Sequence, residues 1–380
     1  MIRIPFNKPY FTGKETDYIR ESVASGKISG DGLFTKKCHQ FFESRYGFKK
    51  TLLTTSCTDA LEMAAILCRI EPGDEVIAPS FTFVSTVNAF VLRGARIVFA
   101  DSETATPNID ASAIEALITP RTKVIVPVHY AGVACDMDAI LNLARKHGLL
   151  VVEDAAQAVD SFYKGKPLGS LGSMATFSFH ETKNVISGEG GMFVANDAQF
   201  VNRAEILREK GTNRSAFFRG EVDKYRWVDI GSSFLPSEII AAFLYAQLEH
   251  LDEIQSRRRS LWNLYRQGLG DLESRGILKL PFVPDYATNN GHMFYVVCED
   301  LEQRDKLIEH LRDREILAVF HYQSLHKSPF YEKRHDGRDL PNSDRYTDCL
   351  LRLPLYYELS TADVGTIVDS VVSFFGQRSR

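Results

Sequence analysis

Cysteine is scarce in this sequence and is never paired at short spacing. Six cysteines are spread over 380 residues, at Cys38, Cys57, Cys68, Cys135, Cys298 and Cys349. No two of them form the CxxC pair that zinc ribbons and redox sites use. The sequence also lacks the dense cysteine content that stabilises small secreted domains. We therefore expect a reduced, cytosolic protein without a cysteine-based metal site.

Long apolar runs and concentrated charge are missing as well. The N-terminus, MIRIPFNKPY, has no apolar core of signal-peptide length, and no segment approaches the apolar length that spans a bilayer. The formal net charge is −4, and the short basic run Arg257–Arg259 fits the solvated face of a helix. A nucleic-acid surface would need a concentrated basic excess. These absences favour a cytoplasmic protein that binds neither membranes nor nucleic acid.

The glycine-rich motif of dinucleotide-binding folds is a third absence. No GxGxxG opens a strand-to-helix turn, and the glycines at Gly169, Gly172 and Gly188–Gly191 are not followed by the helix that such a motif needs. A nicotinamide-dependent dehydrogenase is therefore disfavoured.

The sequence does contain a long alternation of strand and helix patterns. Apolar residues make up 44% and charged residues 25%, as in ordinary folded proteins. The alternation predicts a mainly parallel sheet with helices on both faces. Its elements include a helix over Asp110–Ile118, a helix-like stretch over residues 79–94 and a strand that ends at His129. We expect a large α/β domain over residues 1–250 and a smaller α+β domain over 251–380, on which the N-terminal segment is a candidate to pack.

Several side chains with chemical or stacking potential stand at the ends of the predicted strands. They are Ser56, Phe81, His129, Asp154 and Ser178. Ligands of such sheets bind beyond the carboxyl ends of the strands. Ser56 also occupies the N-cap position of a predicted helix, with Asp59 three residues on. The start of that helix is a candidate anion site, although an ordinary capped helix explains the motif more simply.

Asp154 and Lys183 suit one particular chemistry. Asp154 follows the apolar run 149–152, and Lys183 follows the apolar run 175–179. A lysine amine can hold pyridoxal phosphate (PLP) as a Schiff base, and a carboxylate opposite the pyridine nitrogen keeps the ring protonated. A strand-end acid and a solvated surface lysine are the alternative interpretation.

Six segments together resemble the DegT/DnrJ/EryC1/StrS family of sugar aminotransferases, over nearly the whole chain. They are TTSCTDALEMA (54–64), PSFTFVSTVNA (79–89), VVEDAAQAV (151–159), FSFHETKN (177–184), GEGG (188–191) and LPLY (353–356). The resemblance implies the fold-type I architecture of PLP-dependent transferases, with a mainly parallel seven-stranded sheet in the large domain. It also implies a homodimer with shared active sites.

The resemblance carries over to individual positions. It implies that Lys183 bonds to PLP and that Asp154 faces the ring nitrogen of the cofactor, as the two catalytic residues. It further implies that Gln157 lies near the ring hydroxyl of the cofactor, that Phe83 stacks on the ring, and that Cys57, Thr58 and Ser178 bind the phosphate. Ser233 of the second subunit would take the place of an asparagine that other family members use. The implied substrate contacts are His180, Tyr322 and His326.

Two segments, SCTDALEM and SFHETKN, are most similar to family members that aminate C4 of dTDP-4-keto-6-deoxyglucose. Those enzymes use glutamate and release 2-oxoglutarate and dTDP-4-amino-4,6-dideoxygalactose, a precursor of enterobacterial common antigen. Some relatives carry histidine in place of the lysine and act as dehydratases, so Lys183 favours transamination. Amination at C3 or of another keto-sugar, and a non-catalytic regulator with this fold, remain open alternatives.

Overall fold

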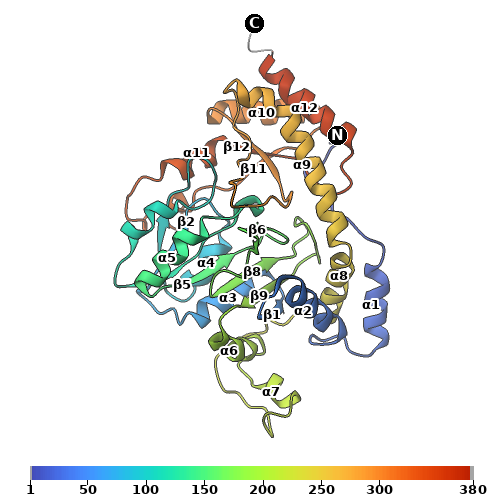
Figure 1. The fold of residues 1–380 in the computed structure, drawn as a ribbon, viewed down its shortest axis with the longest axis vertical. Helices are drawn as coiled ribbons and strands as arrows, with labels where there is room; N and C mark the ends of the chain where they lie inside the picture. The colour runs from blue at the N-terminus through green and yellow to red at the C-terminus, as the bar shows by residue number, and fades with distance from the viewer. Residues whose placement is uncertain (1, 377–380) are drawn as a thin grey trace.

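A seven-stranded sheet is the centre of the computed structural model, which describes residues 2–376 (Figure 1). Its strands lie in the order β1-β9-β8-β5-β4-β2-β3. Their bounds are β1 Lys50–Thr54, β2 Glu75–Pro79, β3 Arg96–Ala100, β4 Thr122–Ile125, β5 Leu150–Asp154, β8 Met174–Ser178 and β9 Gly191–Ala195. Strands β8, β5, β4, β2 and β3 pair in parallel, and β9 is antiparallel to both β1 and β8. The predicted mainly parallel sheet is confirmed.

Helices cover both faces of this sheet, because successive strand residues point to opposite sides. Leu53 and Ile77 belong to one buried core, whereas their neighbours Leu52 and Val76 belong to another. The first core includes residues of α2 (Leu33–Tyr46), α5 (Met137–His147) and α8 (Glu238–Leu248). The second includes residues of α3 (Cys57–Leu67), α4 (Ser85–Val91) and α6 (Ala198–Arg208).

A second, smaller sheet carries the C-terminal part of the chain. It has three antiparallel strands in the order β10-β12-β11, at Phe294–Val297, Leu350–Leu353 and Val319–Phe320. With α9 (Leu251–Ser274), α10 (Leu301–Arg312) and α12 (Thr361–Gly376) it encloses a separate core. Ile4 is buried in this core and forms a β-bridge with Ile316. We propose that the smaller domain begins with α9, which contributes residues to both this core and the large one.

The remaining α-helices and β-strands of the described chain are short or peripheral. They are α1 (Glu15–Ala24), α7 (Arg214–Phe218), α11 (Pro341–Cys349), β6 (Phe162–Tyr163) and β7 (Lys166–Pro167). The segment that carries α7 projects from the body at the end of the molecule opposite the small sheet (Figure 1). Within residues 2–376, no helix has both the length and the apolar character needed to cross a bilayer.

Two predicted helices differ from the structure. Residues 110–118 form only the 3₁₀ turns Ala111–Ala113 and Glu115–Leu117, because Asp110 caps a short turn through the N–H of Ser112. Ala111 and Ile114 alone are fully buried there, which is too little apolar contact to stabilise a longer helix. The stretch 79–94 becomes helical only at Ser85, so Phe81 and Phe83 lie in the loop before α4.

Candidate active site

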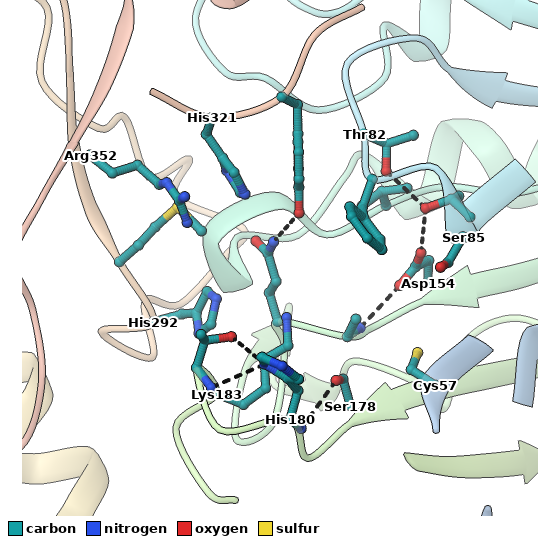
Figure 2. Close-up of a pocket in the computed structure, with 18 of the residues that line it drawn as sticks. Cys57, Thr82, Ser85, Asp154, Ser178, His180, Lys183, His292, His321 and Arg352 are labelled. Carbon is teal, nitrogen blue, oxygen red and sulfur yellow. Dashed lines mark hydrogen bonds between the residues drawn. The ribbon is translucent and has the colours of Figure 1, made fainter. Parts of the chain in front are cut away.

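A cavity of about 690 Å³ lies beyond the carboxyl ends of β5 and β8 (Figure 2). Its lining combines residues of the large sheet and α3 with residues of the small sheet and the N-terminal segment. It therefore lies where an open α/β sheet is expected to bind its ligand. The cavity brings together most of the predicted site residues: Cys57, Thr58, Phe83, Asp154, Gln157, Ser178, His180, Lys183 and Tyr322.

Asp154 is the last residue of β5, and its carboxylate lines this cavity. One carboxylate oxygen accepts a 2.7 Å hydrogen bond from the Thr86 hydroxyl, and the other accepts a 3.1 Å bond from the N–H of Ala156. Burial raises the pKa of this carboxyl, and the two hydrogen bonds and the charge of Lys183 act against that rise. A cation bound in the cavity would favour the ionised form further.

Glu153 points to the opposite face of β5, as strand geometry requires of a neighbour. Its carboxylate accepts hydrogen bonds from the N–H groups of Gly169 (2.8 Å) and Gly172 (2.6 Å) and lies 3.0 Å from Nε2 of His129. The expectation that His129 reaches the site is therefore wrong, because its ring is fully buried against Glu153. Phe81 also misses the cavity, since it packs in a separate core beside Tyr130.

Lys183 lies in the turn that follows β8, and a hydrogen bond of 2.9 Å from its N–H to the carbonyl of His180 closes that turn. Burial lowers the pKa of its amine, while Cys57 and Asp154 act in the opposite direction. A lower pKa leaves more of the amine neutral and nucleophilic near neutral pH. Within residues 2–376 the amine has no hydrogen bond or ion pair, so it is free to react in the cavity.

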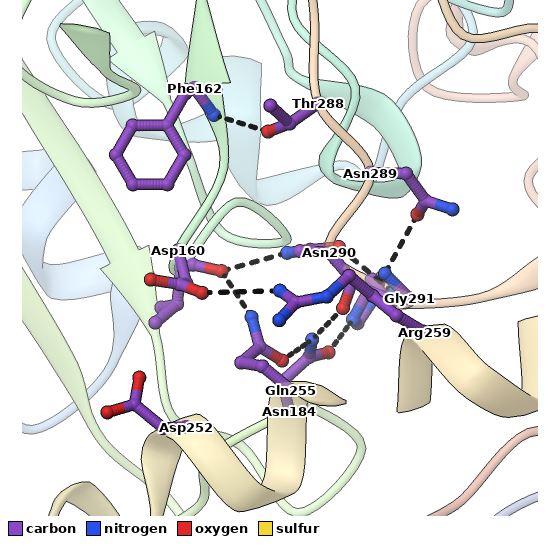
Figure 3. A network of polar contacts seen from close by, with 12 residues as sticks. Asp160, Phe162, Asn184, Asp252, Gln255, Arg259, Thr288, Asn289, Asn290 and Gly291 are labelled. Atoms are coloured by element: carbon purple, nitrogen blue, oxygen red, sulfur yellow. Dashed lines mark hydrogen bonds and ion pairs between the residues drawn. The ribbon is translucent and has the colours of Figure 1, made fainter. Parts of the chain in front are cut away.

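A buried network of amides holds this turn in place (Figure 3). The side-chain N–H₂ of Asn184 donates to Gln255 of α9 (2.7 Å) and to the carbonyl of Asn290 (2.9 Å), and its oxygen lies 2.8 Å from the ring of His292. Gln255 in turn donates to the carbonyl of Val159. The network joins the turn that carries Lys183 to the segment after Asp154 and to α9.

The first turn of α3 forms the other end of the cavity. Ser56 caps it by accepting a 3.0 Å hydrogen bond from the N–H of Asp59, as predicted. Cys57 and Thr58 follow in the first turn, where N–H groups have no helical partner and the helix dipole favours an anion. The hydroxyls of Ser85 and Ser178 also line this part of the cavity.

Gly191, the last residue of the GEGG segment, packs directly against the backbone at the start of α3. A Cβ at residue 191 would lie 2.3 Å from the carbonyl carbon of Ser56 and 2.4 Å from the nitrogen of Cys57. Any other residue would push β9 away from the first turn of α3. The glycine therefore sets where the N–H groups of Cys57 and Thr58 can lie.

The chemistry of this lining fits PLP. A nucleophilic lysine, a buried carboxylate that no cation of residues 2–376 pairs with, and a helix start with several hydroxyls match the aldehyde, ring nitrogen and phosphate of that cofactor. Phe83, whose side chain is 56% exposed, lines the cavity and offers a flat apolar face. The residues present can therefore hold the cofactor that the sequence predicts.

Three further predicted site residues, Gln157, Tyr322 and His180, also face the cavity. The Gln157 side chain accepts a 2.6 Å hydrogen bond from the N–H of Ala131 and donates one of 3.3 Å to the Tyr322 hydroxyl. Tyr322 adopts a left-handed backbone with φ of 50°, which directs its ring into the cavity beside Phe83. The ring of His180 also faces the cavity and bonds to Thr182.

His326 and Ser233 do not line the cavity. The ring of His326 is buried outside the cavity, because its Nδ1 lies 2.8 Å from the Ser80 hydroxyl and its Nε2 faces Asp344. The predicted substrate contact at His326 is therefore not supported by its position. Ser233 lies outside the cavity of its own chain and forms a β-bridge with Glu209.

Four side chains that sequence reasoning missed also line the cavity: Thr86, His292, His321 and Arg352. Thr86 lies inside the quoted segment PSFTFVSTVNA, and its position one turn from Thr82 was the available signal. Burial lowers the pKa values of His292 and His321, which keeps both rings neutral. These two histidines and Arg352 come from three separate parts of the small domain, so no local pattern in the sequence connects them.

Known proteins resemble this chain over its whole length. The model of the DegT/DnrJ/EryC1/StrS aminotransferase family matches residues 9–372. The spore coat polysaccharide biosynthesis protein SpsC of Bacillus subtilis (strain 168) is 34% identical over 377 residues, which cover 97% of this chain and 96% of SpsC.

Solved structures agree with the sequence comparison. The aminotransferase TlmJ from Streptoalloteichus hindustanus superposes with a TM-score of 0.90 at 31% identity and covers 100% of both chains. The PLP form of Spr1654 from Streptococcus pneumoniae has a TM-score of 0.90 at 26% identity, over 98% of this chain and 99% of that one. The fold is that of the PLP-dependent aminotransferases. This chain therefore belongs to the DegT/DnrJ/EryC1/StrS aminotransferase family, which depends on PLP.

Proposed function

We propose that the chain transfers an amino group from glutamate to C4 of dTDP-4-keto-6-deoxyglucose, with dTDP-4-amino-4,6-dideoxygalactose and 2-oxoglutarate as products. The observation that carries an aminotransferase function is one cavity that contains a nucleophilic Lys183, a buried Asp154 and the first turn of α3. The choice of sugar and of C4 rests on the likeness of SCTDALEM and SFHETKN to enzymes of that specificity.

Bound PLP supplies an aldehyde carbon that accepts the amine, and a ring that withdraws electron density from the carbon being deprotonated. Asp154 would keep the ring nitrogen protonated, and the hydrogen bond from the Thr86 hydroxyl holds its carboxylate in place. The N–H groups of Cys57 and Thr58, with the Ser178 hydroxyl, would bind the phosphate. Phe83 and Gln157 would contact the ring.

Lys183 has two successive tasks. Its amine would hold the cofactor in the resting enzyme and would be free in the cavity once the amine of glutamate takes its place. The freed amine takes the proton from the α-carbon of glutamate as a general base and returns a proton as a general acid. With the keto-sugar as the second substrate, the same amine moves the proton in the reverse direction. The hydrogen-bonded turn from His180 to Lys183 fixes the backbone from which this side chain reaches the cavity.

A panel of nucleotide-linked keto-sugars tests this function. Purified protein with PLP and glutamate is given each sugar, the yield of 2-oxoglutarate is measured, and the position and stereochemistry of the new amine are determined by NMR. We expect turnover with dTDP-4-keto-6-deoxyglucose and an axial amine at C4, the galacto configuration. The Lys183→Ala protein serves as the control and should give no 2-oxoglutarate.

Other outcomes of the panel would change the proposal in defined ways. An amine at C3, or turnover with a different keto-sugar only, would replace the substrate assignment but keep the aminotransferase. Absence of glutamate-dependent turnover across the panel, with no visible absorbance from bound cofactor, would favour a non-catalytic protein with this fold.

A further inference from the structure

The ring of His292 has one nitrogen whose hydrogen bond is fixed by its neighbours. Its Nδ1 lies 2.8 Å from the side-chain oxygen of Asn184, the residue that follows Lys183. The N–H₂ group of this asparagine donates to Gln255 and to the carbonyl of Asn290, so the amide cannot be turned round. An amide oxygen only accepts hydrogen bonds. The imidazole therefore carries a proton on Nδ1.

The other nitrogen of His292 is an acceptor, because the ring stays neutral. Burial lowers the pKa of His292 well below its ordinary value, and the charges of Lys183, Arg258 and Arg352 act in the same direction. In a neutral imidazole with its proton on Nδ1, Nε2 keeps a lone pair that accepts a hydrogen bond. No group in residues 2–376 donates to this nitrogen, although the ring lines the cavity. Nε2 is therefore available to a ligand.

His321, which also lines the cavity, has the opposite polarity. Its Nδ1 lies 2.7 Å from the hydroxyl of Tyr130, and that buried hydroxyl has no other hydrogen-bond partner in the described part of the chain. An unpaired buried donor costs free energy, so the Tyr130 hydroxyl donates to Nδ1. The proton of the neutral His321 ring then lies on Nε2. His321 is consequently a donor and cannot replace His292 as an acceptor.

The position of His292 brings this acceptor near the reacting carbon. Its ring is bonded to the residue after Lys183, and both side chains line the same cavity (Figure 2). The charge of Lys183 is also near enough to act on the pKa of His292. A group that donates to Nε2 must therefore lie close to the carbon at which the amino group is exchanged.

The two substrates of the proposed reaction differ at that place. In glutamate, the amine that is transferred is the only donor on the reacting carbon, whose neighbours are a carboxylate and a methylene group. In dTDP-4-keto-6-deoxyglucose, C4 lies between C3, which carries a hydroxyl, and C5, which carries a methyl group. The C3 hydroxyl is thus the donor beside the reacting carbon of the sugar.

We propose that Nε2 of His292 accepts a hydrogen bond from the C3 hydroxyl of the keto-sugar, with Asn184 as the residue that positions the ring. This role rests on the proposed function and deepens it. It assigns His292 to the sugar half-reaction alone. It also gives the enzyme a means to distinguish sugars that carry a hydroxyl beside the keto group from sugars that lack one.

A pair of sugars and a set of matched variants test this contact. Enzyme in the amine form of the cofactor is titrated with dTDP-4-keto-6-deoxyglucose and with the same sugar lacking its C3 hydroxyl. The return of the visible absorbance band gives each half-saturating concentration. Enzyme loaded with PLP is titrated with glutamate for reference, and the loss of the band is followed.

The variants separate the two nitrogens of the ring. His292→Asn keeps an amide that can bond to Asn184 but has no atom at the place of Nε2. His292→Gln is longer and returns an amide near that place. His147→Gln, at an exposed residue of α5, is the control.

We expect the unaltered protein to reach half-saturation with the complete sugar at a concentration roughly 2- to 10-fold lower than with the sugar that lacks the hydroxyl, the range for one net hydrogen bond. In His292→Asn the complete sugar should lose that advantage, and the two sugars should differ less than about twofold, because groups in contact are coupled. The glutamate titration should also change less than about twofold, since no coupling is expected there. His292→Gln should restore part of the preference, and His147→Gln should match the unaltered protein.

Any of three results would overturn the proposal. A preference for the complete sugar that persists in His292→Asn would leave the histidine with a structural role only. An effect on glutamate as large as that on the complete sugar would remove His292 from the sugar half-reaction. Equal titrations of both sugars by the unaltered protein would exclude a contact with the hydroxyl. If His292→Asn fails to bind PLP, a preference in His292→Gln equal to that of the unaltered protein overturns the proposal.

Failure of the proposed function would look different. An unaltered protein that shows no spectral response to glutamate would refute the aminotransferase function. A response to glutamate but to neither sugar would refute the proposed substrate. The contact at His292 would be refuted together with either of them.

Discussion

At the scale of single residues, the cavity depends on side chains whose ionisation burial has changed. Burial raises the pKa of the Asp154 carboxyl and lowers that of the Lys183 amine, so both groups are driven towards their neutral forms. A neutral lysine is the form that attacks an aldehyde. A protonated ring nitrogen would return Asp154 to its charged form, which couples cofactor binding to the ionisation of the site.

Replacement of Asp154 by asparagine tests that coupling. Asp154→Asn keeps the hydrogen bond from Thr86 but removes the negative charge that holds the ring nitrogen protonated. Turnover should fall by roughly 100-fold or more, the usual effect of removing one group that stabilises charge at a reacting centre. Some PLP should remain bound, as measured by its visible absorbance. Asp138→Asn, at an exposed acid that pairs with Lys164, is the control. Turnover at the level of the unaltered enzyme would exclude Asp154 from the mechanism.

Asp59 gives the site a predictable response to pH. Burial, with repulsion from Glu62, raises the pKa of its carboxyl from 3.8 to about 6. The folded protein therefore binds this proton more tightly than the unfolded chain, and the free energy of unfolding falls as pH rises from about 4 to 6. Asp59→Asn should remove this loss. Because the carboxyl is partly exposed to solvent, we expect a modest effect. Between pH 4 and pH 7.5, Asp59→Asn should gain about 1 kcal/mol of unfolding free energy relative to the unaltered protein.

The measurement is urea unfolding of both proteins at the two pH values. Asp197→Asn, at the partly exposed N-cap of α6, is a suitable control because hydrogen bonds from Gln199 lower the pKa of that carboxyl, so its removal should shift stability with pH in the opposite direction. A difference between unaltered protein and Asp59→Asn that is the same at both pH values would contradict the assignment of this titration to Asp59.

At the scale of secondary-structure elements, strands and helices with a clear apolar period were predictable, and irregular connections were not. The patterns that became β5, β8 and α3 placed Asp154, Lys183 and Ser56 correctly, because Asp154 and Ser56 stand at the ends of regular elements and Lys183 lies in the turn that follows one. The chain after β4 was not predictable, because Pro127 interrupts the strand pattern and the ring of His129 turns to Glu153. The contribution of Arg352 depends on how the small sheet packs against the large one, which no local pattern encodes.

The contact between β9 and α3 is the element-level feature most open to test. Gly191→Ala places a methyl group against the backbone of Ser56 and Cys57. We expect the protein to lose about 1–3 kcal/mol of unfolding free energy, typical of overpacking, and to bind PLP more weakly. Gly365→Ala on α12, where a Cβ meets nothing within 4 Å, is the matched control. Urea unfolding and PLP titration measure the two effects. If PLP affinity stayed unchanged while stability fell, the start of α3 would not be the phosphate site.

At the scale of the whole molecule, the segment around α7 is the most exposed apolar part of the described chain. Trp227 is 81% and Phe218 is 69% exposed, and Tyr225 and Val228 beside them are more than half exposed. Exposed aromatic groups of this size are characteristic of interfaces. Members of this family are usually dimeric, and Ser233, the residue predicted to reach the partner's cofactor, lies close by in sequence.

We therefore expect a homodimer whose interface includes this segment. Trp227→Glu should weaken association by at least about 10-fold, since a buried aromatic anchor commonly contributes more than 1.4 kcal/mol. Sedimentation velocity over a range of concentrations measures the change. Leu301→Glu, at a 43% exposed leucine of α10, is the control and should leave association unaltered. A Trp227→Glu protein that dimerises as tightly as the unaltered one would place the interface elsewhere.

The N-terminal segment has a practical consequence for anyone who handles this enzyme. Ile4 is held in the small-domain core, and Phe6 and Asn7 form part of the cavity wall. Residues this near the start of a chain are commonly trimmed or joined to purification tags. Here, such changes would disturb the cavity wall, and a batch with ragged ends would give a mixture of substrate affinities that could be mistaken for cooperativity.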